Sequence, residues 1–539
     1  MADSKREIER KYEATAGTRL PDLSRVAGVS AVVHRGVTEL DAVYHDTEDH
    51  RLAADSLTLR RRTGGSDAGW HLKFPVASGI RDELREPLSD TLPRSLAGLV
   101  RSRVRGAALV PVVRLRSARD VRHLVDDRGE LLAEVAVDEV RAARLTGGGS
   151  TATWTEIEVE LADDGDPALL DAVERRLRKA GIRPSASASK LARALAETDP
   201  GAAPDSGKKL RKAKKAKPGK VEQGKEKPRK EKAARAEKAR EEPAPPTAGD
   251  HVLAYVRRQT EAIITLDPAV RRDLPDSVHQ LRVATRRLRS ALRTYRRILD
   301  RDVTDPVGRE LKWLAAELGI DRDQEVLDAR LRGRLDELPR TLLLGPVRGR
   351  LRIRSTARRT GSRRRTMAVL DGKRYLALLE SLDALLADPP LLPAASRAPR
   401  RALPRALLKE YRRLAKRVGH ALDLPPGHDR DIALHEARKA AKRTRYAAEA
   451  ARPALGKPAK RFAKRMKAVQ SLLGDHQDSV VAREALRTLA VQAHGAGESA
   501  FTWGLLYGRE EAAAAARERE LPGVWERASR PELRAALGG

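Results

Sequence analysis

The sequence predicts a multidomain protein. An N-terminal antiparallel β tunnel or barrel with accessory helices precedes a C-terminal all-α domain of two four-helix bundles. Three observations predict this fold class. Residues 1–200 alternate charged and apolar side chains with period two, as half-buried strands do. Residues from 250 onward form long Leu/Ala/Arg segments with few β-branched runs, and one helical motif occurs there twice.

The composition excludes several classes of protein. Of the 539 residues, 40% are hydrophobic, so the chain can bury real cores. It has no cysteine, which excludes thiol catalysis, cysteine-based zinc sites, iron–sulfur clusters and disulfides. No stretch is long and apolar enough to span a membrane, and the N-terminus lacks the apolar region of a signal peptide. We therefore expect a cytoplasmic protein.

The positive charge is concentrated in the second half. Residues 1–200 hold 32 Lys and Arg against 33 Asp and Glu, whereas residues 251–539 hold 60 against 35. Such a polycation predicts a polyanionic partner: nucleic acid, polyphosphate or an anionic membrane surface. Between the halves, residues 199–249 are rich in Lys, Ala, Glu and Pro and poor in large apolar side chains, which predicts a disordered linker.

Six to eight mostly antiparallel strands are expected before the linker. Each candidate shows period-two alternation, and Gly or Pro marks the turns between candidates. One helix is expected at residues 166–180, opened by Pro167 and closed by Gly181. The candidate strands are residues 7–11, 56–62, 69–74, 112–116, 131–140 and 153–161.

Several of these strands carry charges of one sign on one face. Glu156, Glu158 and Glu160 share a face, because successive side chains of a strand point to opposite sides. Arg60 and Arg62 share a face on another strand. In an ordinary sandwich such faces meet solvent. The alternative is a closed barrel lined by carboxylates on some strands and by Arg and Lys on others, which would bind a divalent cation together with a multiply charged phosphate compound.

An ordered set of motifs over residues 1–198 resembles the CYTH domain, the triphosphate tunnel family. Glu7-Ile8-Glu9-Arg10-Lys11 matches the ExExK signature that opens this domain. The later blocks follow in the family's order: Tyr44-His45-Asp46-Thr47, Leu59-Arg60-Arg61-Arg62, Trp70-His71-Leu72-Lys73, Arg81-Asp82-Glu83, residues 114–119, 134–138 and 156–160, and Ser189-Lys190. The resemblance implies an eight-stranded antiparallel tunnel that hydrolyses triphosphate compounds with Mg²⁺ or Mn²⁺.

The resemblance also implies roles for individual residues. The implied catalytic residues are Glu7, Glu9 and Lys11, with the two carboxylates as metal or water ligands. The implied phosphate contacts are Arg60, Arg62, Lys73, Arg114, Arg116 and Lys190, and the implied metal ligands are Asp138, Glu158 and Glu160. A β-bulge would turn Arg119 and Glu156 to the other face, so these two receive no role.

The helical half repeats itself. His, Arg, Arg or Lys, and Arg stand at offsets 0, 3, 7 and 10 in two copies, and each copy is followed by Lys and a Leu-Gly…Asp element. The first copy has His279, Arg282, Arg286 and Arg289, then Lys312, Leu318, Gly319 and Asp323. The second has His435, Arg438, Lys442 and Arg445, then Lys467, Leu473, Gly474 and Asp478. We expect two four-helix units related by a pseudo-twofold axis.

These offsets place the cations on one stripe of a helix. A lone stripe of this kind is ordinarily a solvated face, but like charges at this spacing repel one another without an anion. Two stripes brought together would form a basic groove for a linear polyanion. The repeat resembles the CHAD domain over residues 250–530. The resemblance implies that a basic surface with the eight stripe residues binds inorganic polyphosphate, and that the protein can associate with polyphosphate granules. Lys409, Arg412, Arg413 and Arg417 share a further basic helix, which we expect to extend the groove.

The two stripe histidines have a second interpretation as metal ligands. Neither His279 nor His435 has a carboxylate or a second histidine four residues later, so phosphate contact or helix capping is the preferred interpretation.

The leading hypothesis is hydrolysis of inorganic triphosphate, or a related triphosphate, in the tunnel, with polyphosphate bound by the helical domain and no membrane partner. Three alternatives remain. The first is a polyphosphate-binding targeting protein without enzymatic activity, and the second is a tunnel adenylate cyclase. The third is a nucleic-acid binder, although aromatic residues make up only 3% of the chain and stacking platforms are scarce. Non-specific binding to nucleic acid is expected in any case.

Overall fold

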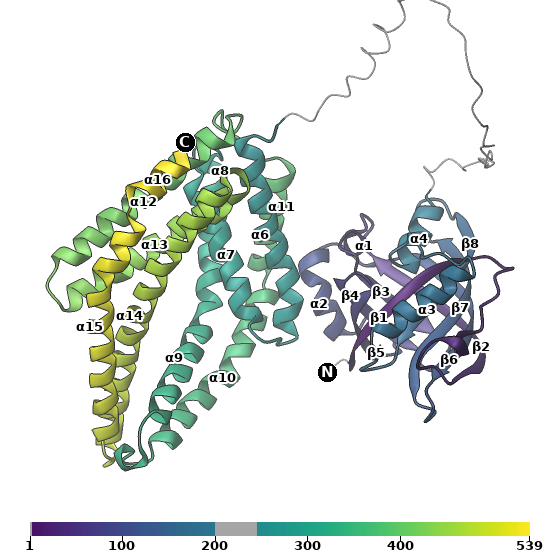
Figure 1. Cartoon of the computed structure of the whole chain (residues 1–539), viewed down its shortest axis with the longest axis horizontal. Coiled ribbons are helices and arrows are strands. Elements are labelled where there is room, and N and C mark those ends of the chain that lie inside the picture. Colours follow the sequence, from purple (N-terminus) through teal and green to yellow (C-terminus); the bar gives the residue numbers. More distant parts are fainter. Residues whose placement is uncertain (1–2, 200–244, 539) are drawn as a thin grey trace, which may run out of the picture. The chain divides into compact units, whose positions relative to one another are not determined.

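The computed structural model describes residues 3–199 and 245–538, apart from the side chains of residues 320–322, 357–360 and 362. The predicted linker, residues 199–249, lies for the most part outside the described residues. The chain divides into two compact units, residues 1–225 and 226–539, and each is described by itself (Figure 1). No helix of the described residues is long and apolar enough to cross a membrane.

The first unit is a closed antiparallel barrel. Its strands follow the order β1-β5-β4-β3-β2-β6-β7-β8, and β1 closes the ring by pairing with both β5 and β8. The sequence prediction of a closed antiparallel barrel is confirmed, with eight strands in the described residues. They are β1 (Asp3–Ala14), β2 (Ala31–Asp46), β3 (Thr58–Thr63), β4 (Gly69–Ala77), β5 (Ile80–Pro87), β6 (Val110–Val125), β7 (Leu131–Arg144) and β8 (Thr151–Leu161).

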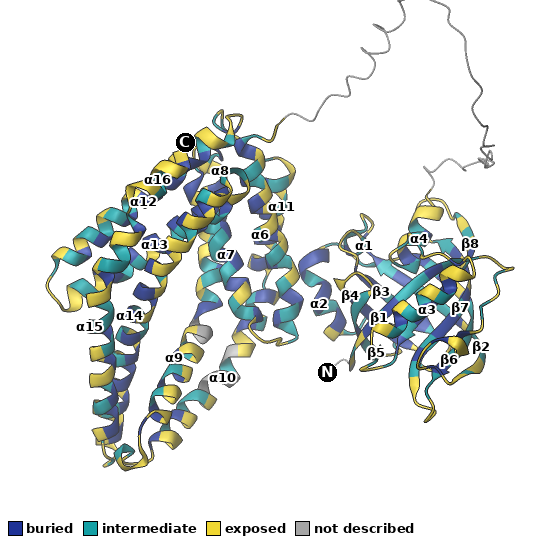
Figure 2. Cartoon of the chain, in the orientation of Figure 1, coloured by how far each residue is buried: buried dark blue, intermediate teal, exposed yellow. Residues whose placement is uncertain are grey.

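Apolar side chains cover the outside of this barrel, beneath helices. Helix α2 (Arg94–Val104) packs its leucines on the outer apolar residues of β3, β4 and β5. Helix α3 (Ala168–Lys179), at the position expected from the sequence, covers β1, β7 and β8 in the same way. Figure 2 shows both helices against the buried strands. Because the apolar side chains of these strands point outward, the charged side chains at the alternate positions point into the interior.

One end of the barrel interior is filled. Inward-facing apolar residues of β2, β6, β7 and β8 form a cluster with Leu191 and Ala194 of α4 (Lys190–Glu197). The shorter elements η1 (Leu23–Arg25) and α1 (Arg51–Ala54) lie between the early strands. The polar cavity therefore occupies the rest of the interior.

The second unit is all helical, as predicted. Its helices are α6 (Ala248–Arg271), α7 (Ser277–Thr294), α8 (Arg301–Glu317), α9 (Gly319–Asp336), α10 (Val347–Asp371), α11 (Lys373–Ala387), α12 (Pro399–Asp423), α13 (His428–Leu455), α14 (Lys457–Gly495), α15 (Phe501–Ala528) and α16 (Pro531–Gly538), with the short η2 (Arg340–Leu342).

The helices follow the predicted repeat. The first copy consists of α6, α7, the broken pair α8 and α9, and the broken pair α10 and α11. The second consists of α12, α13, the continuous α14, and α15 with α16. One core cluster lies mainly in each copy. A third core, which the sequence did not predict, joins the copies where α9 and α10 pack against α14 and α15 (Figure 1).

Candidate functional site

A polar cavity of about 510 Å³ lies inside the barrel. Its two sides differ in charge: most of the carboxylates come from β1, β7 and β8 or the turn after β8, and half of the cations come from β3, β4 and β5. The charged residues lining it are Lys5, Glu7, Glu9, Lys11, Arg35, Arg60, Arg62, Asp67, Lys73, Arg81, Arg85, Arg119, Glu134, Glu158, Glu160, Asp163 and Lys190. This arrangement suits a ligand that carries several negative charges together with a cation.

The carboxylate wall begins on β1. Its alternation directs Glu7, Glu9 and Lys11 into the cavity, and Glu7 and Glu9 are buried. Burial raises the pKa of Glu7 to about 7, although Lys73 opposes this shift by donating a 2.6 Å hydrogen bond to Oε2. Burial would also raise the pKa of Glu9, but Lys11, 3.1 Å away, together with Lys73 and Arg81 outweighs burial, and the pKa is lowered. Two neighbouring carboxylates thus titrate in different ranges.

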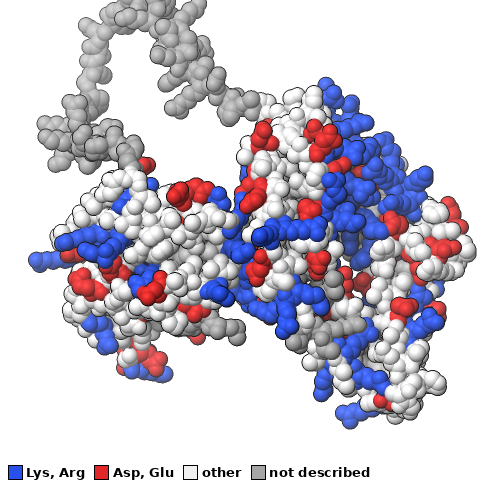
Figure 3. Space-filling model, turned by 180° about the vertical axis from the view of Figure 1, so that it is seen from behind, with Lys and Arg blue, Asp and Glu red and all other residues white. Residues whose placement is uncertain are grey.

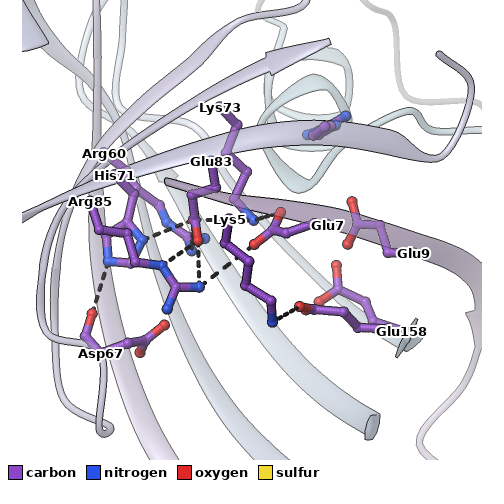
Figure 4. A network of polar contacts seen from close by, with 12 residues as sticks. Lys5, Glu7, Glu9, Arg60, Asp67, His71, Lys73, Glu83, Arg85 and Glu158 are labelled. Atoms are coloured by element: carbon purple, nitrogen blue, oxygen red, sulfur yellow. Dashed lines mark hydrogen bonds and ion pairs between the residues drawn. The ribbon is translucent and has the colours of Figure 1, made fainter. Parts of the chain in front are cut away.

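The cationic wall is organised around the fully buried Glu83 of β5 (Figure 4). His71 Nδ1 lies 2.9 Å from Glu83 Oε1, and Arg85 Nε donates a 2.5 Å hydrogen bond to Oε2. Lys73 Nζ is 3.4 Å and Arg60 Nη2 is 3.7 Å from Oε1. Burial opposes ionisation of Glu83, but His71, Lys73 and Arg60 together hold its pKa well below the usual range. One carboxylate therefore fixes the directions of several cations.

Arg62 pairs with Asp67, but its positive charge is still disfavoured. Burial and the nearby Arg60 and Arg119 together lower its pKa to about 9. An anion between these guanidinium groups would reverse this shift by offsetting their mutual repulsion.

A second carboxylate cluster lies deeper, toward α4. Asp138, Glu156 and Glu158 are all buried and bring one oxygen each within 4.8 Å of one another. Lys190 Nζ lies 3.0, 2.9 and 2.5 Å from these three carboxylates, and Arg119 donates to Asp138 and Glu158 at 2.7 and 2.6 Å. An all-oxygen donor set fits a hard divalent cation such as Mg²⁺ or Mn²⁺. In this structure Lys190, Arg119 and Lys11, which pairs with Glu158, balance the cluster's three negative charges.

The structure brings most of the predicted tunnel residues together. Glu7, Glu9, Lys11, Arg60, Arg62, Lys73, Glu158, Glu160 and Lys190 all line the cavity. Asp138 does not line the cavity itself but lies next to Glu158, which does. Glu160 is not part of this cluster and instead faces Lys5 at 2.9 Å, while Glu156 takes the third position.

Two predicted phosphate contacts are not brought to the cavity. Arg114 and Arg116 occupy the outer face of β6, where Arg114 pairs with Asp41 of β2 at 2.9 Å and Arg116 is 63% exposed. Residues of β6 at odd positions face inward, so Arg119 is the guanidinium that this strand contributes. This corrects the placement expected from the sequence.

The sequence interpretation also missed cavity residues. Lys5 extends the Glu7–Glu9–Lys11 alternation by one step, and Arg85 extends that of Arg81 and Glu83. Continuing the period-two pattern along β1 and β5 would have found both.

In the helical unit, the two predicted stripes lie on α7 and α13, which pack against each other. Tyr295 donates a 2.9 Å hydrogen bond to the carbonyl of Ala447, and Arg287 lies 3.3 Å from Glu449. None of the eight stripe residues is fully exposed: Arg282 is buried and the other seven are half-buried. The stripes are therefore partly shielded from solvent.

The two stripes come close to each other at Arg286 and Lys442, the residues at offset 7 of each copy. Burial lowers the pKa of Lys442 to about 7, and two neighbouring guanidinium groups add to this: Arg438 of the same copy and Arg286 of the other copy. Asp323 and Asp478 act in the opposite direction. The structure thus brings predicted residues of both copies to one place, with more cations than carboxylates.

The Leu-Gly…Asp elements hold the offset-3 arginines. Arg282 donates to the carbonyl of Gly319 at 3.2 Å and to Asp323 at 3.1 Å, and Arg438 lies 3.8 Å from Asp478. A Cβ on Gly319 would lie 3.0 Å from Arg282 Nη2, and one on Gly474 would lie 3.5 Å from Arg438 Nε. The duplicated glycines thus provide room for the guanidinium groups.

Basic hollows lie beyond the stripes. One of about 590 Å³ is lined by Arg297, Arg405, Lys409, Arg412, Arg413 and Lys416, and thus includes three of the four α12 residues that we expect to extend the groove. Another of about 330 Å³ has Arg289 of the first stripe in its wall, with Lys312. Figure 3 shows Lys and Arg gathered over one side of this unit. Neither His279 nor His435 belongs to a cluster of possible metal ligands within the described residues.

Comparisons with known proteins agree with this architecture. The family profile of the CYTH domain matches residues 5–195, and that of the CHAD domain matches residues 254–487. An uncharacterized protein of Mycobacterium tuberculosis strain H37Rv is 38% identical over 532 residues, which cover 95% of this chain and 94% of that protein.

Two solved structures are similar to parts of the chain. PptA from Streptomyces chartreusis has 23% identity and a TM-score of 0.45, covering 52% of this chain and 100% of its own. The CHAD domain from the plant Ricinus communis has 26% identity and a TM-score of 0.41, covering 55% and 92%. CYTH domains are triphosphate tunnel domains, and this chain belongs to the family of proteins in which a CYTH domain is followed by a CHAD domain.

Proposed function

We propose that the barrel hydrolyses inorganic triphosphate, or a closely related triphosphate, with Mg²⁺ or Mn²⁺. One observation carries this proposal: a single cavity has an Arg/Lys wall opposite a carboxylate wall. Guanidinium and ammonium groups bind phosphate oxygens, whereas carboxylates recruit a divalent cation. A triphosphate with its metal is a ligand that needs both walls.

The cationic wall binds and orients the phosphates. Arg60, Lys73 and Arg85 are already directed by Glu83, so little side-chain entropy is lost when the substrate enters. Arg62 and Arg119 contribute further positive charge where the transferring phosphoryl group develops negative charge.

The carboxylates hold the cation and the water. Asp138, Glu156 and Glu158 are the proposed ligands, with Glu9 and Glu160 on the adjoining wall. A bound divalent ion would neutralise phosphate charge and orient the substrate. Glu7, with its pKa near neutrality, is suited to accept a proton from the attacking water.

The helical unit is proposed to bind inorganic polyphosphate along the paired stripes of α7 and α13. The support is the half-buried excess of cations at the convergence of the stripes, which repel one another unless an anion lies among them. A tether between the units would raise the local concentration of phosphate chains near the barrel. Association with polyphosphate granules follows from the same binding.

The test is phosphate release from inorganic triphosphate by the full chain, with and without Mg²⁺. We expect metal-dependent release that the Glu7→Gln/Glu9→Gln variant loses by at least a hundredfold. Glu139→Gln is the matched control, because Glu139 is exposed on the outer face of β7 next to Asp138. Its turnover should equal that of the unmodified chain.

Other outcomes would select other functions. Release no greater than that of the double variant would leave the barrel as a phosphate-binding domain without turnover. Formation of cyclic AMP from ATP, without release from triphosphate, would identify a cyclase.

A further inference from the structure

Three side chains from three helices of the helical unit converge on one point. Asp431 lies in the first turn of α13, His476 in the middle of α14 and Glu518 in the second half of α15. His476 Nε2 lies 3.3 Å from Asp431 Oδ1 and 3.3 Å from Glu518 Oε1. The imidazole is only 2% exposed, so its aim at the two carboxylates is fixed within the packed interior.

The second oxygen of each carboxylate contacts an arginine and not His476. Arg483 donates a 2.8 Å hydrogen bond to Asp431 Oδ2, and Arg430 Nε lies 3.1 Å from Glu518 Oε2. Each carboxylate therefore presents one oriented oxygen to His476. Arginine partners of this kind act as the outer contacts that orient metal-ligating carboxylates.

The spacing of the three atoms matches a metal site better than a strong hydrogen bond. A charge-assisted N–H···O bond has a length of about 2.7–2.9 Å, whereas one N–H shared between two acceptors at 3.3 Å makes two weak hydrogen bonds. A tetrahedral centre with bonds of about 2.0–2.1 Å holds its ligand atoms about 3.3–3.4 Å apart. Both distances from Nε2 equal this separation, and all three atoms lie within 4.8 Å.

This group is independent of the duplicated stripe. When the two Leu-Gly elements are superposed in sequence, His476 corresponds to Asp321. When the two stripes are superposed, Asp431 corresponds to Pro275. The histidine and this aspartate therefore occur in the second copy alone, although the phosphate stripe occurs in both.

We propose that Asp431, His476 and Glu518 bind a divalent first-row transition-metal ion such as Zn²⁺, at a site distinct from the barrel. The imidazole nitrogen selects Zn²⁺ over Mg²⁺, which prefers oxygen ligands. Three protein ligands leave a fourth position for water or a phosphate oxygen. The ion would tie α13, α14 and α15 together. The proposal does not depend on the function proposed for the barrel.

The test measures Zn²⁺ retained by the full chain during dialysis against excess Mg²⁺, which occupies oxygen-only sites. We expect about one Zn²⁺ per chain, a rise in melting temperature with Zn²⁺, and visible absorption of a tetrahedral centre after Co²⁺ replaces it. His476→Gln should abolish all three signals, and Asp431→Asn or Glu518→Gln should weaken binding at least tenfold. His494→Gln is the matched control, because His494 is exposed on the same helix.

Two results would overturn the proposal. One is no retained Zn²⁺, which would make His476 a hydrogen-bonded bridge between two carboxylates. The other is retention that is unchanged in Asp431→Asn and Glu518→Gln, which would place the ion at other histidines. Asp431→Asn and Glu518→Gln nearly preserve side-chain volume, so they test the metal site even if His476→Gln does not fold. Circular dichroism checks that each variant is folded.

Discussion

Lys73 of β4 and Glu7 of β1 form a 2.6 Å hydrogen bond over β5, the strand between theirs, yet the pKa of Glu7 is raised to about 7. Burial is the larger effect, and the nearby carboxylates Glu83 and Glu160 add to it. A carboxyl group that changes charge near neutrality, inside a cavity of opposed walls, makes the chemistry of the barrel sensitive to pH.

The activity should rise as the pH increases through about 7, because only the deprotonated Glu7 can accept a proton. Glu7→Gln should lower kcat by about 10²–10⁴-fold and remove this rise. The measurement is kcat against pH with saturating Mg²⁺ and triphosphate. A Glu7→Gln profile that keeps the same rise would assign the titration to another group.

The same shift predicts an effect on stability. The folded pKa of Glu7 lies above the ordinary value of 4.5 for a glutamate, so the protonated carboxyl favours the folded state. This contribution is fully present below pH 4.5 and is lost as the pH rises through about 7. The melting temperature of Glu7→Gln minus that of the unmodified chain should therefore be larger at alkaline pH than at acidic pH. An equal difference at both pH values would contradict the shift.

The two faces of β6 should respond differently to the same substitution. Arg119→Gln removes an inward guanidinium that holds Asp138 and Glu158, so kcat/KM should fall by about a hundredfold. Arg116→Gln removes an exposed outward one and should change kcat/KM by less than about twofold. Steady-state kinetics on triphosphate compares them. Equal losses would mean that the register of β6 differs from the one described.

Polyphosphate binding should depend on pH through Lys442. Burial lowers its pKa to about 7, so the free protein loses this charge as the pH rises through 7. A bound polyanion favours the protonated form, so affinity should fall by roughly tenfold between pH 7 and about pH 8.5. Lys442→Arg restores the residue type found at the corresponding Arg286 and should flatten this dependence. Calorimetric titration at several pH values measures it, and an unchanged slope in Lys442→Arg would contradict the prediction.

Alanine at the two repeat glycines should have unequal effects. In α14, Gly474→Ala should stabilise the helical unit by about 0.5–1 kcal/mol, because its Cβ meets Arg438 at an ordinary 3.5 Å. Gly319→Ala should lose this gain, because its Cβ would lie 3.0 Å from the guanidinium of Arg282, which is bound to Gly319 and Asp323. Thermal melts of both variants provide the comparison. Equal shifts would show that Arg282 moves freely.

Much of the barrel was predictable because period-two alternation identifies strands and their charged faces. The pattern does not say which face lies inside. That is decided by α2 and α3, whose leucines cover the apolar faces from outside. The choice of inward face matters most for β6. Arg114 and Arg116 are the more conspicuous pair in the sequence, but the odd-numbered residues of β6 face the interior, and Arg119 is the one of these three arginines at an odd position.

In the helical unit, repetition predicted the stripes and their association, since two copies of one motif tend to pack by symmetry. The third core and the group around His476 were not predictable in this way. Leu331, Leu486 and Trp503 of the third core lie on different helices, and so do the three proposed metal ligands. Side chains that meet only through tertiary packing leave no periodic signal in the sequence.

The strand β1 has a practical consequence for anyone who redesigns the ends of this protein. Its first half pairs with β5 and its second half pairs with β8, so it is the strand that closes the barrel. It also carries Glu7, Glu9 and Lys11. Deleting it would split the cylinder along its length and remove part of the acidic wall at the same time, so trimming for expression should spare residues 3–14.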